Sequence, residues 1–65
     1  MTFKKWLVQF TGENTPRGDF ARDVHADAEF PDTKSIEKIN NYLFSIGMSD
    51  RDFVIDALNE WLKTL

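Results

Sequence analysis

Residues 20–31 read FARDVHADAEFP, and Asp19 stands immediately before them. Asp19, Asp23 and Asp27 recur every four residues, and His25 is the single histidine of the chain. Carboxylates and a histidine gathered in one segment raise the question of a metal or catalytic site. The Phe-Pro pair that closes the segment points instead to an architectural role, because proline cannot continue a helix and keeps the residue before it extended.

The helical positions of these side chains separate the histidine from the aspartates. At about 100° per residue, Asp23 and Asp27 lie about 40° and 80° from Asp19, whereas His25 lies about 240° away. Three carboxylates alone could hold a hard cation, but calcium sites usually draw their oxygen ligands from a curved loop. We therefore predict a solvated acidic edge, with no catalytic residue, metal ligand or cofactor-binding residue. We expect Asp27 to accept backbone amides of the loop that follows the helix.

The composition describes one small folded domain that spans residues 1–65. The chain is 42% hydrophobic and 29% charged, and its lack of cysteine excludes disulfides and thiolate zinc sites. A net charge of −3 opposes non-specific attraction to nucleic acid and to anionic lipid. No apolar run approaches the roughly 18 residues of a membrane span, and the N-terminus lacks the pattern of a signal peptide. We therefore expect a cytoplasmic protein with no membrane partner.

Two helices are expected before the end of the opening segment. The first has Thr2 as its cap and Gly12 at its end, with an apolar stripe at helical spacing. That stripe consists of Phe3, Trp6, Leu7 and Phe10. The second helix is predicted from Pro16 to about Ala28, with Thr15 as the N-cap, because proline fits the first helical position without losing a hydrogen bond.

A third helix is expected after a loop that runs to Lys34. It should begin at Ser35 and end at Gly47, which we expect in the left-handed conformation of a helix C-cap. Its apolar stripe consists of Ile36, Ile39, Leu43 and Ile46.

Two local patterns predict the start of the last helix. Ser49 and Asp52 resemble a capping box, and Met48 and Phe53 occupy the two positions of a hydrophobic staple around it. A broad apolar face then follows, formed by Phe53, Val54, Ala57, Leu58, Trp61, Leu62 and Leu65. No segment alternates with period two, so we predict an all-α fold, a compact four-helix bundle that can include one short extra turn.

A set of residues along the chain follows the pattern of a known family. They are Phe20-Ala21, Asp27 after five residues, Phe30-Pro31 after two more, and then Ile39 and Tyr42-Leu43. This order resembles the YozE SAM-like family of small bacterial proteins, found mainly in Gram-positive organisms. The resemblance extends over nearly the whole chain, although Leu58 stands where an aromatic residue is usual and Ile36 where a tyrosine is usual. It implies a bundle similar to sterile alpha motif domains and carries over no catalytic residue.

Apolar residues that miss the core stripes, or that widen the apolar face of the last helix beyond about 100°, are candidates for an interaction surface. They are Val8, Phe44, Ile55 and Leu62. If they are exposed, we expect a non-enzymatic module that binds an unknown protein partner or a second copy of itself. The alternative is that helices on two sides bury them, as in many small bundles. Trp6 and Trp61 are predicted as core residues rather than binding residues.

Two other classes of function remain as alternatives. A nucleic-acid-binding or regulatory accessory protein would use a basic patch formed by Lys4, Lys5, Arg17 and Arg22. These cations could equally be scattered solubilising charges on an acidic protein. A small hydrolase or metal enzyme would need convergent titratable groups in a cavity, and one histidine without cysteine supplies few of them. We therefore expect no enzyme and no cofactor.

Overall fold

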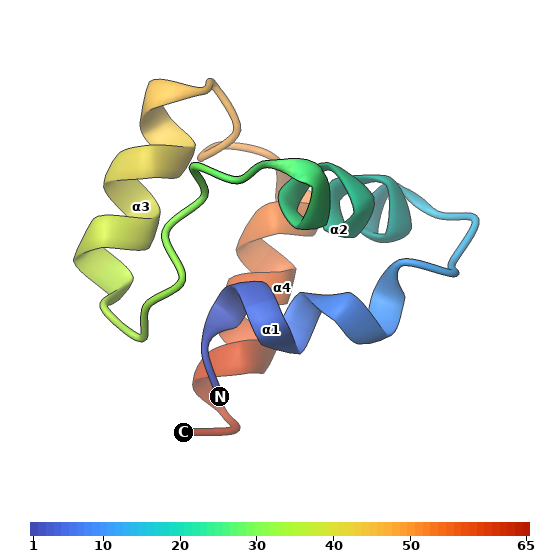
Figure 1. Cartoon of the computed structure of the whole chain (residues 1–65), viewed down its shortest axis with the longest axis horizontal. Helices are drawn as coiled ribbons and strands as arrows, with labels where there is room; N and C mark the ends of the chain where they lie inside the picture. Colours follow the sequence, from blue (N-terminus) through green and yellow to red (C-terminus); the bar gives the residue numbers. More distant parts are fainter.

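The computed structural model describes residues 1–65 and contains helices but no strand, which confirms the predicted all-α fold. In chain order, the elements are α1 (Phe3–Leu7), the 3-10 turn η1 (Val8–Phe10), α2 (Pro16–Ala26), α3 (Ile36–Ser45) and α4 (Asp52–Leu62). Helix α4 runs behind α1 and α2, α3 stands to one side, and both chain ends lie at the foot of α4 (Figure 1). None of these helices is both long enough and apolar enough to cross a bilayer.

The first helix begins as predicted but is shorter than predicted. Thr2 Oγ1 accepts the Lys5 amide N–H at 3.3 Å, as expected of its cap. The α-helix ends at Leu7 and tightens into η1 instead of continuing to Gly12. The side chains of Gln9 and Thr11 donate to the carbonyls three residues before them, both at 2.9 Å. Such local bonds compete with the regular helical ladder, which accounts for the early end.

Helix α2 begins at the predicted residue and ends slightly early. Thr15 Oγ1 accepts the Gly18 amide N–H at 3.0 Å, and Pro16 is the first helical residue, as expected. The helix stops at Ala26 because Asp27 turns away into an extended conformation. Its side chain accepts the Glu29 amide N–H at 2.9 Å, which confirms the predicted role of Asp27 as a cap for the loop.

Helix α3 has the termini that the sequence predicted. Ser35 Oγ accepts the Lys38 amide N–H at 3.4 Å. At the other end Gly47 has a φ of 74°, in the left-handed region that glycine adopts without strain. The amide of Met48 donates to the Leu43 carbonyl at 2.9 Å, and that of Gly47 donates to Phe44 at 3.1 Å. This pair of bonds is the Schellman motif.

The predicted start of α4 is wrong. Its N-cap is Arg51, no side chain caps the helix, and Ser49 lies in the turn before it. The Schellman motif already uses the Met48 amide, and the Arg51 amide then closes a turn onto the Met48 carbonyl at 3.3 Å. The helix therefore begins two residues later than the capping box implied. Met48 and Phe53 both pack against the core, but they do not hold the staple positions of the observed N-terminus.

The core gathers side chains from all four helices and from Phe30. Phe3 lies at its centre, with ring centroids 5.5 Å from Trp61 and 6.1 to 6.3 Å from three other aromatic rings. Trp6 and Trp61 are both buried, as predicted. The core consists of Phe3, Trp6, Leu7, Phe20, Ala21, Val24, Phe30, Ile39, Leu43, Val54, Ala57, Leu58 and Trp61. Two residues assigned to the α3 stripe, Ile36 and Ile46, are exposed instead, which corrects that prediction.

Candidate functional site

The three aspartates of residues 19–31 lie in three different environments. Asp19 forms an ion pair with Arg22 on the same helix, and Asp27 accepts a hydrogen bond from the Tyr42 hydroxyl. Asp23 is exposed and has no hydrogen-bond or ion-pair partner. No three histidine, aspartate or glutamate side chains of the chain come close enough together to hold a metal ion.

Asp27 joins three parts of the fold. One carboxylate oxygen accepts from the Glu29 amide and the other from Tyr42 on α3, while Lys4 Nζ on α1 donates to the Asp27 backbone carbonyl at 2.9 Å. The hydrogen bond from Tyr42 is the main cause that lowers the pKa of Asp27, and the hydrogen bond from the Glu29 amide lowers it further. The same bond to Asp27 raises the pKa of Tyr42 to about 12. Phe30 closes the core above this cluster, with its ring 5.2 Å from Tyr42.

The two candidate basic lysines and Arg22 have partners within the chain itself, although the partner of Lys5 is the most distant. Lys4 is bound to the Asp27 carbonyl, and Lys5 lies 4.0 Å from Asp32. Arg22 pairs with Asp19 and also donates to backbone carbonyls of the loop before α2, at 2.7 and 2.9 Å.

Arg17 is the most heavily engaged of the four candidate cations. It donates to both carboxylate oxygens of Glu13 at 3.0 and 2.8 Å and to Glu60 on α4 at 3.2 Å. Its guanidinium carbon also lies 4.0 Å from the centre of the Phe10 ring. The hydrogen bond from Arg17 lowers the pKa of Glu13, and the reciprocal bond raises the pKa of Arg17. This network fastens the loop before α2 to α4.

The four candidate apolar residues are all exposed, but the structure divides them. The exposed fractions are 44% for Val8, 77% for Phe44, 42% for Ile55 and 41% for Leu62. Ile55 and Leu62 lie together in a hollow between α3 and α4, which we call the α3–α4 groove; neither Val8 nor Phe44 lines it. The groove has a volume of about 230 Å³. Its residues are Ile36, Asn40, Ser49, Ile55, Leu58, Asn59 and Leu62.

The groove contains side chains that the sequence analysis did not select. Ile36 was placed in the core stripe, yet it is 37% exposed because α3 turns Ile39 and Leu43 towards the core and leaves Ile36 at its edge. Asn40 follows one turn later on the same side of α3, as the 3.6-residue period requires. A weak signal was present, since Ile36 lies about 60° from Ile39 and marks the rim of the stripe rather than its centre.

The family model described as YozE SAM-like fold matches residues 2–64 of this 65-residue chain. The chain belongs to the YozE SAM-like family. No curated protein and no solved structure matches it. In this YozE SAM-like domain, the residues that carry the resemblance have architectural positions: Phe20 and Phe30 are buried, and Asp27 caps the loop between α2 and α3. Leu58, which replaces the usual aromatic residue, also lies in the core.

Proposed function

We propose that this domain is a non-enzymatic interaction module that binds another protein through the α3–α4 groove. The observation that carries the proposal is the exposure of Ile55 and Leu62, side by side with Ile36, in a hollow that no charged side chain lines. Exposed aliphatic side chains that share one concave surface gain free energy when a partner covers them. The amphipathic helix of a partner fits a channel between two helices of this kind.

The polar residues of the groove also favour a protein partner. Asn40, Ser49 and Asn59 supply both hydrogen-bond donors and acceptors beside the aliphatic side chains. Apolar contacts at the centre with neutral hydrogen-bonding groups around them are the usual composition of a protein interface.

Two observations favour this proposal over the other classes. The groups with shifted pKa values form the pairs Glu13–Arg17 and Asp27–Tyr42, and each pair joins parts of the fold. This structural use of the titratable groups favours an interaction module over an enzyme. A nucleic-acid-binding role would require the four candidate cations to leave the acceptors that they contact within the chain. The groove, by contrast, is open without any rearrangement.

The test is affinity capture from nuclease-treated lysate of the native host, followed by binding measurements on each purified partner. The Ile55→Ser/Leu62→Ser variant should weaken binding about tenfold or more, because side chains at the centre of an interface contribute most of its free energy. Val8→Ser is the matched control, because Val8 is an equally exposed aliphatic residue outside the groove. Circular dichroism checks that both variants stay helical.

Equal binding by the parent chain and the double variant would rule out the groove. Capture that depends on nucleic acid and weakens steeply with salt would instead favour the basic residues, since phosphate contacts release counterions.

A further inference from the structure

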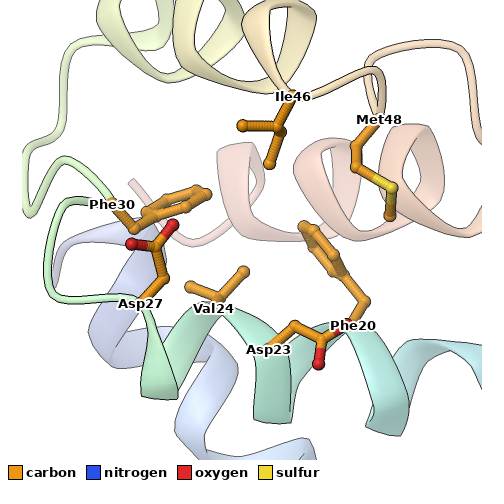
Figure 2. Close-up of a pocket in the computed structure, with 7 residues that line it drawn as sticks. All are labelled: Phe20, Asp23, Val24, Asp27, Phe30, Ile46 and Met48. Carbon is orange, nitrogen blue, oxygen red and sulfur yellow. The ribbon is translucent and has the colours of Figure 1, made fainter.

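A second hollow lies between α2 and the connection from α3 to α4, and we call it the α2 pocket (Figure 2). Phe20, Val24 and Phe30 form one side of it, and Ile46 and Met48 face them. Asp23 and Asp27 contribute the two polar side chains. The pocket has a volume of about 90 Å³. That is the space of about three water molecules, well below the roughly 300 Å³ of a small-molecule site, so it suits one aliphatic side chain.

The two sides of the α2 pocket differ in how firmly they are held. Phe20, Val24 and Phe30 are at most 3% exposed and belong to the core. Ile46 is 47% exposed, and Met48 is only partly buried. Methionine is unbranched and adapts its shape to what it contacts. The pocket therefore has a fixed floor and an adjustable mouth, a combination that can close around an inserted side chain.

The two carboxylates of the α2 pocket have different capacities to bind a ligand. Both oxygens of Asp27 already accept hydrogen bonds, from Glu29 and from Tyr42. Asp23, one helical turn earlier, has no partner within the chain. Lys4 lies near Asp27 but donates to its backbone carbonyl, at 2.9 Å. Asp23 is therefore the acceptor that remains for a positive charge next to the apolar pocket.

We propose that the α2 pocket binds a segment of a partner protein in which an aliphatic side chain stands next to a lysine or arginine. The aliphatic side chain enters between Val24 and Ile46, and the neighbouring cation lies against Asp23. The chain carries a net charge of −3, so the approach of a cationic segment is also favoured over longer distances. This site is separate from the α3–α4 groove and goes beyond the proposed function.

The probe is an acetylated, amidated Leu-Lys dipeptide, titrated into the ¹⁵N-labelled protein while amide chemical shifts are recorded. We expect saturable shifts at Val24, Ile46 and Met48. Two matched dipeptides separate the contributions of charge and shape: Leu-Glu reverses the charge, and Gly-Lys removes the aliphatic group. Both should bind more weakly than Leu-Lys.

The variant that isolates the cation contact is Asp23→Asn, which keeps the shape of the side chain and removes its charge. It should weaken Leu-Lys binding about two- to fivefold, the range for an exposed ion pair. Asp56→Asn is the control, because it makes the same charge change on α4 outside the α2 pocket. The Ile55→Ser/Leu62→Ser variant should bind the dipeptide unchanged, so failure at one site is distinguishable from failure at the other.

Several results would overturn the proposal. Equal binding of Leu-Lys and Leu-Glu would remove the role of charge, and shifts confined to other residues would remove the pocket. Butylammonium that binds as tightly as Leu-Lys would assign the site to free amines. Shifts at Ile46 and Met48 that appear on concentrating the protein alone would assign it to a second copy of the chain.

Discussion

Gly18 stands at a position where the fold leaves no room for a side chain. It lies in the first turn of α2 and is buried. A Cβ atom there would stand 2.0 Å from the backbone carbonyl oxygen of Glu13. That carbonyl is held in place, because it accepts from Arg22 while the Glu13 amide donates to Phe10 at 3.0 Å. The loop before α2 therefore crosses the helix so closely that only glycine fits.

Gly18→Ala should destabilise the protein by about 1–3 kcal/mol, because the overpacked contact outweighs the gain of about 1 kcal/mol in helix propensity. The measurement is the free energy of unfolding in urea, followed by circular dichroism. Gly12→Ala is the control, since a Cβ there meets nothing within 4 Å and the backbone has an ordinary φ. A Gly18→Ala variant as stable as the parent would show that the loop can move aside.

Helix α3 is the element held least tightly to the rest of the molecule. Helices α1, α2 and α4 approach one another closely, whereas the backbone of α3 stays farther from all of them. Its attachments are side chains: Ile39 and Leu43 are fully buried, and Tyr42 is bonded to Asp27. The wider spacing is also what leaves the α3–α4 groove open.

We therefore predict that α3 opens before the rest of the bundle. Amides of α3 should exchange with deuterium about tenfold or more faster than those of α4, since elements with few buried contacts open at lower free energy. Tyr42→Phe removes the bond to Asp27 and should accelerate exchange in α3 further, with little change in α4. Uniform protection across α3 and α4 would show that the four helices open as one unit.

At the scale of elements, the sequence predicted best those features that depend on neighbours in the chain. The caps at Thr2, Thr15, Ser35 and Gly47 need only a side chain or a glycine a few residues from a backbone group. Ser49 is not the cap because it lies inside the turn that the Arg51 amide closes onto the Met48 carbonyl. The early end of α1 depends on side-chain bonds that its apolar spacing does not reveal.

The candidate site was harder to predict than the helices. The spacing in α4 separates Ile55 and Leu62 from the core, but the face that meets α3 depends on how the two helices are placed. For that reason Val8 and Phe44, chosen by the same reasoning, are exposed yet lie outside the groove. The α2 pocket is still less visible, since it joins Val24 to Ile46 across a distance in the sequence that no local pattern spans.

At the scale of the whole molecule, hydrogen bonds to ionisable groups connect distant segments and make stability depend on pH. The pKa of Asp27 is lowered below its ordinary value of 3.8, so its contribution is present above that pH and is lost as the pH falls through the lowered value. The pKa of Glu13 is also lowered, from its ordinary value of 4.5, by the hydrogen bond from Arg17, so its contribution to stability is likewise lost as the pH falls through the lowered value. Tyr42 acts in the opposite sense: its pKa rises from 10.0 to about 12, so its contribution is complete below pH 10.0 and disappears by about pH 12.

These signs give a specific prediction for Tyr42→Phe, measured against the parent by thermal or urea unfolding across the pH range. The variant should be less stable, with the largest and most constant difference between about pH 5 and pH 10, where Asp27 is ionised and Tyr42 is protonated. The difference should shrink in acid, as Asp27 takes up a proton, and should shrink again between pH 10.0 and about 12, as Tyr42 ionises. Other groups titrate in both proteins and cancel from this difference. A gap that stays constant from acid to alkali would show that the ionisation of Asp27 and Tyr42 does not control how much their hydrogen bond stabilises the fold.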